Sequence, residues 1–255
     1  MSLIPLPPSL IPFLKDYLPQ PLSSCPHRPF ITLTYAQSLD SKIASKPGQQ
    51  TKISHLETKT MTHYLRSKHD AILVGIGTVL ADDPKLNCRY HDPGSDVISS
   101  PRPIIIDPHH KWKYSKSQLY KIHESNQGLS PFIIIDESIS IDPVELEALD
   151  HHGGKFIPLP LFNKSKSESW ESILSSLLQL NLKSIMIEGG AMIINDLLSL
   201  QHDKKFIDSL IITIGPVFLG SEGVTVHPHT NVELDNINWW SGIQDSILCA
   251  NVSTK

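Results

Sequence analysis

Residues 71 to 84 read AILVGIGTVLADDP, and this stretch indicates how the chain folds. An apolar run of strand length passes directly into Gly75 and Gly77. The hydroxyl of Thr78 and a pair of carboxylates that begins at Asp82 then follow before a proline. In an open α/β sheet, ligands bind at the carboxyl ends of the strands. The stretch is therefore either a binding turn at the end of a buried strand or a flexible loop with ordinary turn residues.

These glycines do not complete either of the common nucleotide-binding fingerprints. Leu80 stands where the third glycine of G-x-G-x-x-G belongs, and no Gly-Lys-Ser/Thr follows that would form a Walker loop. A ligand-binding role for this turn therefore needs support from other strand ends.

Apolar runs alternate with helical patterns along the chain, which is typical of an α/β fold with a mostly parallel sheet covered by helices. Runs such as IIID and IMI lack polar alternation and predict strands buried on both faces. We expect strands at residues 30–37, 71–75, 102–107, 131–136, 155–159, 183–188, 206–220 and 245–253, the last two pairing antiparallel. We expect helices from a Ser54/Glu57 capping box, from Asp142-Pro143, over 167–181 and over 191–201.

The composition excludes several classes of protein. The chain of 255 residues has 22 basic and 26 acidic residues and a net charge of −4, without a Lys/Arg block, which argues against a nucleic-acid groove. No apolar run approaches the ~18 residues of a membrane span. The three cysteines, Cys25, Cys88 and Cys249, lie far apart in the sequence, and their odd number argues against a disulfide framework. This cysteine usage is typical of a protein in a reducing compartment such as the cytosol.

Residues 1–28 are rich in proline and form an arm ahead of one domain over residues 29–255. No basic residue precedes Lys15 and prolines interrupt the apolar run, so the arm lacks the pattern of a signal peptide. We expect the arm to wrap over the surface, with a short helix near residues 11–17, and the protein to be cytoplasmic.

Two further strand ends carry polar groups. In IEGGAMIINDLL, Glu188 ends a buried strand, and Gly189 and Gly190 lead directly into a helix, whose free amides favour an anion such as a pyrophosphate. The alternative is a tight strand-to-helix turn that needs glycine for its backbone angles. In IIIDPHHKWK, Asp107 could hold a ribose hydroxyl, or the basic residues from His109 onward could meet a 2′-phosphate.

No metal site is expected. The histidines lie mainly in polar loops, and no His-x-x-x-His pair with a third ligand is evident. The zinc-deaminase pattern, His-x-Glu with a later Pro-Cys-x-x-Cys, is absent.

Five stretches in order, TYAQSLDSKIA, LRSKHDAILVGIGTVLADDPKLNCR, RPIIID, IMIEGGAMIINDLL and IITIGPVFLG, resemble the reductases of riboflavin biosynthesis, in particular their stand-alone fungal type. The resemblance covers the chain from about Phe30 to its end. It implies a fold similar to dihydrofolate reductase, NADPH as hydride donor and a homodimer. Since the deaminase motif that accompanies the bacterial members is missing, it also implies reduction before deamination.

The resemblance implies roles for individual residues. The residues that match cofactor contacts are Thr78, Asp82, Ile106, Asp107, Pro108, His109, Gly189, Gly190, Ala191 and Met192, together with Lys52, which stands where the bacterial members carry a tryptophan. The residues that match contacts to the phosphorylated ribosylaminopyrimidine substrate are Arg66, Leu86, Arg89 and Glu188. Arginine side chains suit the phosphate because their paired N–H groups bind it in a fixed geometry.

The implied reaction opens the sugar ring of the ribosylamino group and reduces it to the ribitylamino form. Glu188 or Asp40 could relay the proton that this reaction needs, and water could do so as well. Two alternatives remain at this point: a dihydrofolate-reductase-like enzyme acting on a pterin, which needs no phosphate contact, and a non-catalytic nucleotide-binding module. The enzymatic assignment requires that the segment after Val74 and the glycine turn after Ile187 meet in one cleft.

Overall fold

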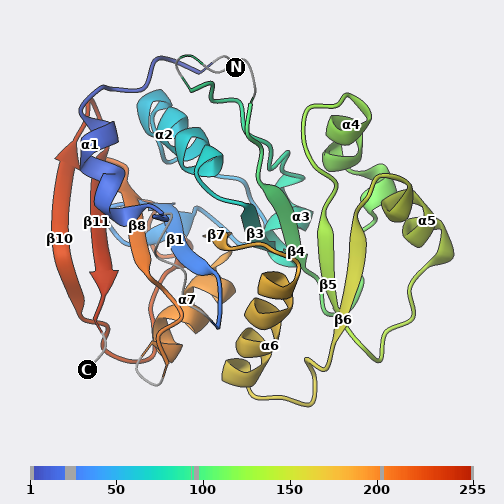
Figure 1. Ribbon diagram of the computed structural model, residues 1–255. Coiled ribbons are helices and arrows are strands. Elements are labelled where there is room, and N and C mark those ends of the chain that lie inside the picture. Colours follow the sequence, from blue (N-terminus) through green and yellow to red (C-terminus); the bar gives the residue numbers. More distant parts are fainter. Residues whose placement is uncertain (1–2, 21–26, 93, 95–97, 202–203, 254–255) are drawn as a thin grey trace.

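A computed structural model describes residues 3–20, 27–92, 94, 98–201 and 204–253 (Figure 1). The strands are β1 (Phe30–Gln37), β2 (Lys42–Ala44), β3 (Ala71–Gly75), β4 (Arg102–Ile106), β5 (Phe132–Asp136), β6 (Lys155–Leu159), β7 (Ser184–Gly189), β8 (Ser209–Ile214), β9 (Val224–Thr225), β10 (Leu234–Ser241) and β11 (Ser246–Val252). The α-helices are α1 (Leu10–Leu14), α2 (Leu56–Ser67), α3 (Ile76–Asp82), α4 (Gln118–Glu124), α5 (Pro143–His151), α6 (Lys166–Gln179) and α7 (Ala191–Leu200), with short 3₁₀ turns at Lys15–Tyr17 and Tyr114–Lys116.

A nine-stranded sheet in the order β10-β11-β8-β1-β7-β3-β4-β5-β6 forms the centre of the molecule. The strands from β8 to β6 are parallel, whereas β11 is antiparallel to β8 and to β10. This confirms the predicted α/β fold with a mixed, mostly parallel sheet, including the antiparallel pairing of the last predicted strands. Neither β10 nor the small β2–β9 sheet was predicted, and β10 escaped prediction because its exposed, polar-rich sequence lacks the pattern of a buried strand.

Helices cover both faces of the sheet, because the strands point alternate side chains to opposite faces. Leu33 of β1 is in register with Ile187 of β7, which is in register with Leu73 of β3, and all three belong to the core beneath α6 and α7. Ile72 and Val74 point to the other face, into the core of α4 and α5. In Figure 1, α6 and α7 lie below the sheet, and α1, α2, α4 and α5 lie above it.

The start of α2 differs from the prediction. The helix is capped by His55 and not by Ser54, and Glu57 makes no capping box. The Glu57 side chain is buried and accepts the backbone N–H of Ile243 at 2.6 Å. Asp245 likewise accepts the backbone N–H of His55 at 2.7 Å. The capping-box prediction was wrong because the acidic residue connects α2 to the distant β10–β11 turn.

The described part of the N-terminal arm covers one face of the sheet. The expected short helix is present as α1 and the 3₁₀ turn that follows it. Leu10 and Leu14 are fully buried in a core shared with residues of α2, β8 and β11. The Ile4 carbonyl also accepts a hydrogen bond from Thr60 of α2 at 2.9 Å.

Truncating the buried leucines of the arm should destabilise the whole protein. We expect Leu10→Ala and Leu14→Ala each to lower the free energy of unfolding by about 2–5 kcal/mol, the usual cost of deleting a buried leucine side chain. Ile11→Ala is the matched control, since that side chain is 42% exposed. Urea denaturation measures the difference, and equal stabilities for the three variants would show that the arm does not pack on the core.

Candidate functional site

A cavity of about 690 Å³ lies at the carboxyl ends of β1, β3, β4, β7 and β8. Its volume is within the range of small-molecule and cofactor sites. The residues that line it come from both stretches that were expected to meet, Gly75–Asp82 and Glu188–Ile194, and the Thr78 hydroxyl is 3.4 Å from the Gly189 carbonyl oxygen, to which it donates. The expectation that these segments share one cleft is therefore confirmed.

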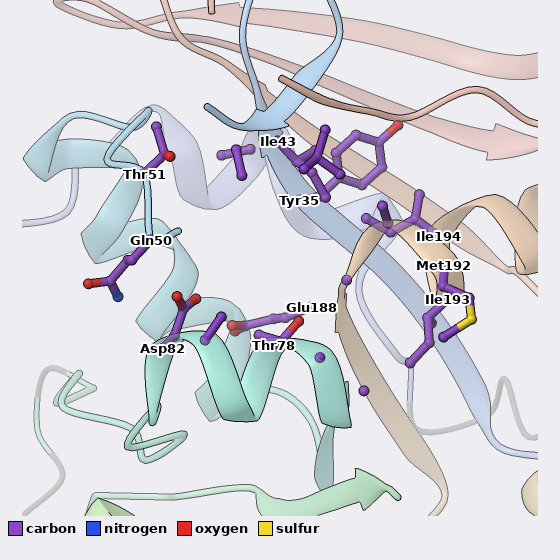
Figure 2. Close-up of a pocket in the computed structure, with 18 of the residues that line it drawn as sticks. Tyr35, Ile43, Gln50, Thr51, Thr78, Asp82, Glu188, Met192, Ile193 and Ile194 are labelled. Carbon is purple, nitrogen blue, oxygen red and sulfur yellow. The ribbon is translucent and has the colours of Figure 1, made fainter. Parts of the chain in front are cut away.

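The glycines after β3 lead into a helix and not into a loop. Gly75 ends β3 and is also the N-cap of α3, and a Cβ at this position would lie 2.9 Å from Ile193 of α7. Since Thr78 and Asp82 are four residues apart on α3, they lie on the same face of the helix, and both line the cavity (Figure 2). Asp83 ends the helix in a left-handed conformation, and its carboxylate accepts the backbone N–H of Gln118 at 3.0 Å, which is a structural role.

The second glycine pair leaves the start of α7 open to the cavity. Gly189 and Gly190 both have a φ of +89°, which favours glycine. No side chain caps α7 and its first turn has no acidic residue, so the amide N–H groups of the helix start are available to an anion. Ala191 and Met192 line the cavity beside them. This geometry fits the pyrophosphate of a dinucleotide.

Glu188 is held by an arginine. Nε and Nη2 of Arg66 each donate to a different oxygen of Glu188 at 2.7 Å, and Nη1 donates to the Asn87 carbonyl at 2.9 Å. The two side chains are only 13% and 20% exposed. Burial opposes the charge of the guanidinium, but the adjacent Glu188 carboxylate raises the pKa of Arg66 above its ordinary value. Glu188 is therefore presented to the cavity as one half of a fixed ion pair.

Asp82 lines the same cavity but has no hydrogen bond or ion pair with a described residue. Burial raises the pKa of its carboxyl group. The other titratable side chains that line the cavity are Tyr35, Lys52 and Glu188. Burial raises the pKa of Tyr35, and Lys52 is exposed.

The segment after β4 reaches the cavity only in part. Ile106 and Pro108 line it, but the Asp107 side chain is fully buried and its Oδ2 accepts the Trp112 N–H at 2.8 Å. His109 stacks on Phe162, with ring centroids 4.8 Å apart, outside the lining residues. The idea that the Asp107 carboxylate binds a ribose hydroxyl is corrected: this carboxylate holds the turn that follows β4.

Asp40 is not a residue of the cavity. Its carboxylate accepts the Ser38 hydroxyl at 2.5 Å and the N–H groups of Leu219 and Gly220 at 3.0 and 2.8 Å. These hydrogen bonds, above all that of Ser38, lower the pKa of Asp40 to about 2. The expected proton relay by Asp40 is corrected, because the residue is an ionised turn anchor away from the cavity.

Leu86 and Arg89 do not line the main cavity. Leu86 is 2% exposed and packs in the core of α4 and α5, so its side chain cannot contact a ligand in this conformation. Arg89 lines a second cavity of about 500 Å³ and is 2.8 Å from the buried His63 ring. Burial and the charges of Arg66 and Arg89 lower the pKa of His63 to about 3, so this imidazole is neutral.

The sequence analysis missed the wall of the main cavity that faces α3. This wall consists of loop residues 47–54, of which only Lys52 was named as a cofactor contact, together with Tyr35, Ile43 and Val224 from β1 and the small β2–β9 sheet (Figure 2). The signal was present, since this polar loop follows β1, whose carboxyl end lies at the binding edge of the sheet.

Within the described ranges, no group of three or more histidine, cysteine or acidic side chains is placed to hold a metal ion. In the same residues, none of the helices has the length and hydropathy needed to span a bilayer.

Comparisons with known proteins point to one family. The model of the RibD C-terminal domain matches residues 29–248. The chain is 61% identical to a 2,5-diamino-6-ribosylamino-4(3H)-pyrimidinone 5′-phosphate reductase of Debaryomyces hansenii, over 99% of this chain and 100% of the relative. It is 40% identical to the solved riboflavin biosynthesis reductase of Saccharomyces cerevisiae, with a TM-score of 0.78 over 96% of this chain and 100% of that one. The riboflavin biosynthesis protein RibD of Aquifex aeolicus is 31% identical over 78% of this chain but only 49% of its own length.

Proposed function

Because the chain belongs to the RibD C-terminal domain family, as a reductase of the fungal type, we propose that it reduces 2,5-diamino-6-ribosylamino-4(3H)-pyrimidinone 5′-phosphate with NADPH. The product is the ribitylamino compound, and the reaction is an early step of riboflavin biosynthesis. The protein is a reductase that uses a reduced nicotinamide cofactor. The choice of NADPH, the site residues, a cytosolic location and the division into an arm (1–28) and a reductase domain (29–255) are parts of the proposal.

The convergence of α3, the open start of α7 and Glu188 in one cavity, with Glu188 held by Arg66, carries this proposal. The amides that follow Gly190 would hold the pyrophosphate of the cofactor, and Thr78 and Asp82 would contact the part of it that lies against α3. When bound, the reduced nicotinamide supplies the hydride that is transferred to C1′ of the substrate. Ile106 and Pro108 would lie along the adenosine half, since they line the cavity next to α3.

The Arg66–Glu188 ion pair would recognise the substrate. Glu188 would accept hydrogen bonds from the amino groups of the substrate, and Arg66 keeps N–H groups beyond those it gives to Glu188 and Asn87. Arg89 lies outside the lining of the main cavity, so its contact with the substrate phosphate requires the substrate to extend past Arg66.

The absorbance of NADPH at 340 nm tests the function directly. The purified protein should oxidise NADPH only when the ribosylaminopyrimidine phosphate is present. Turnover with dihydropterin substrates in its place would establish the pterin-reductase alternative. Binding of NADPH without turnover of either substrate would establish a non-catalytic nucleotide-binding module.

We also propose that the protein is a homodimer and that its two chains contact each other through β10. β10 is an edge strand of the sheet and exposes Ile237 and Trp239 by 53% and 57%. The N-terminal arm contacts two neighbouring residues of this strand. The Tyr17 hydroxyl donates to the Asn236 carbonyl, and the Trp240 indole N–H donates to the Ser9 hydroxyl. An edge strand with exposed apolar side chains suits antiparallel pairing with a second copy about a two-fold axis.

Trp239→Glu should convert the dimer to a monomer. A carboxylate at the centre of such a contact would be desolvated opposite its symmetry mate, which costs several kcal/mol. Sedimentation equilibrium measures the change. Val144→Glu, at a position on α5 that is also well exposed (66%), should leave the mass unchanged. A wild-type mass of one chain, or a Trp239→Glu variant with the wild-type mass, would contradict the assignment of β10.

A further inference from the structure

The proposed reaction needs one proton as well as one hydride. The bond from C1′ of the ribosylamine to the ring oxygen breaks as the nitrogen lone pair forms a C=N bond, and the ring oxygen takes up a proton to become a hydroxyl. The hydride then adds to C1′ and leaves a ribitylamine. A side chain or a water molecule must therefore supply this proton inside the cavity, and this inference rests on the proposed function.

Three of the titratable groups are poorly suited to give that proton. Both carboxylate oxygens of Glu188 already accept hydrogen bonds from Arg66, so this side chain is held by a partner. Tyr35 holds its proton tightly, because burial raises its pKa, and the ammonium group of Lys52 is on the exposed loop 47–54. Asp40 does not line the cavity.

The Asp82 carboxyl group, unlike that of Glu188, is not held by a partner. It projects from the same face of α3 as Thr78, it lines the cavity, and no described side chain or amide pairs with it. In Figure 2, Asp82, Thr78 and Glu188 lie together on the side of the cavity opposite Tyr35 and Ile43. We propose that Asp82 is the proton donor of the reaction and delivers its proton to the ring oxygen of the substrate as the ring opens.

The electrostatic surroundings of Asp82 agree with this role. Burial raises the pKa of its carboxyl group, whereas the neighbouring carboxylate of Glu188 is neutralised by Arg66. The charged and titratable groups that face the same cavity are Lys52 from the loop, Glu188 from β7 and Tyr35 from β1. β3 and β4, on which α3 packs, bring no charged side chain to this end of the sheet except the buried Asp107. The two carboxyl groups of the cavity therefore differ in their surroundings: Glu188 is paired with Arg66, whereas the Asp82 carboxyl group has no partner among the described residues.

The test compares Asp82→Asn with wild type by steady-state kinetics and by NADPH binding. Positioned proton donors contribute ~10²–10⁴-fold to rate, so we expect kcat to fall by at least about 100-fold. The dissociation constant of NADPH, measured by fluorescence titration, should change by less than about 3-fold, because an amide keeps most polar contacts of a carboxylate. In wild type, kcat should decline as the pH rises through the pKa of Asp82, and this decline should vanish in the residual activity of Asp82→Asn.

Asp82→Glu and Asp150→Asn complete the experiment. Asp82→Glu keeps an acid at the site and should recover part of kcat, and Asp150→Asn, at an exposed position of α5 outside the cavity, should behave as wild type. A weakened NADPH affinity with kcat nearly intact in Asp82→Asn would leave Asp82 with a cofactor contact alone and overturn the proposal. A 100-fold loss of kcat in Lys52→Gln, with kcat intact in Asp82→Asn, would also overturn it. A wild-type protein that does not turn over the ribosylaminopyrimidine phosphate would instead refute the proposed function.

Discussion

Replacement of Arg66 by alanine should lower kcat/KM by at least about 100-fold and the free energy of unfolding by about 3 kcal/mol, since removing one partner of a buried ion pair leaves an uncompensated charge. Arg66 gives Glu188 two hydrogen bonds and the Asn87 carbonyl a third. Without the guanidinium, the Glu188 carboxylate loses its fixed direction and its counter-charge within the cavity. Both the stability loss and the activity loss therefore have one cause.

Steady-state kinetics and urea denaturation of the variant measure the two effects. Arg66→Lys keeps the positive charge but cannot make the bidentate contact, so it should restore most of the stability and little of the activity. Lys204→Ala is the control, since it breaks a half-exposed ion pair with Glu171, and such pairs contribute at most ~1 kcal/mol. If Arg66→Ala retained wild-type kcat/KM, Glu188 would not need its partner and the substrate side of the site would have to be reassigned.

Gly190→Ala should raise the dissociation constant of NADPH by about 30-fold, or ~2 kcal/mol. Gly190 has a φ of +89° and a ψ of 143°, a conformation that costs other residues ~1–3 kcal/mol. An added Cβ would also lie 3.0 Å from the Thr78 hydroxyl, where the helix start of α7 meets α3. The substitution therefore moves the amides that would hold the pyrophosphate. Fluorescence titration with NADPH gives the constant.

Gly153→Ala separates backbone strain from the loss of the binding site. Gly153 has a φ of +71° and open space around its Cβ position, and it lies after α5, away from the cavity. It should lose stability without losing NADPH affinity. Equal affinities for the Gly190→Ala and Gly153→Ala variants would show that the start of α7 does not bind the cofactor.

The sequence predicted the central strands because their signal is local. The runs that became β1, β3, β4, β5, β7 and β8 are apolar on both faces and long enough for one strand, which is a property of consecutive residues. The amphipathic helix α6 and the short helix of the arm have the same kind of signal. The exposed strand β10 carries no such pattern, because one edge and one face of it lie outside the core.

The position of residues beside the cavity was predictable where they follow directly from the end of a strand. Gly189, Gly190 and Thr78 lie at strand ends, and parallel strands bring their carboxyl ends to one edge of the sheet. Side-chain roles were less predictable. Asp40 and Asp107 had plausible polar contexts in the sequence, but their carboxylates accept backbone N–H groups of their own turns.

The sequence by itself determined the order of the central strands and of the helices α2, α5, α6 and α7, the family and the two glycine turns, since each follows from residues that are close together in the chain. Only the tertiary structure decided which polar side chains face the cavity and which are used elsewhere. The reason is that the partner of a carboxylate comes from anywhere in the chain: Glu188 pairs with Arg66 from α2, Glu57 holds the β10–β11 turn, and Asp82 alone among the cavity carboxylates is left without a partner among the described residues.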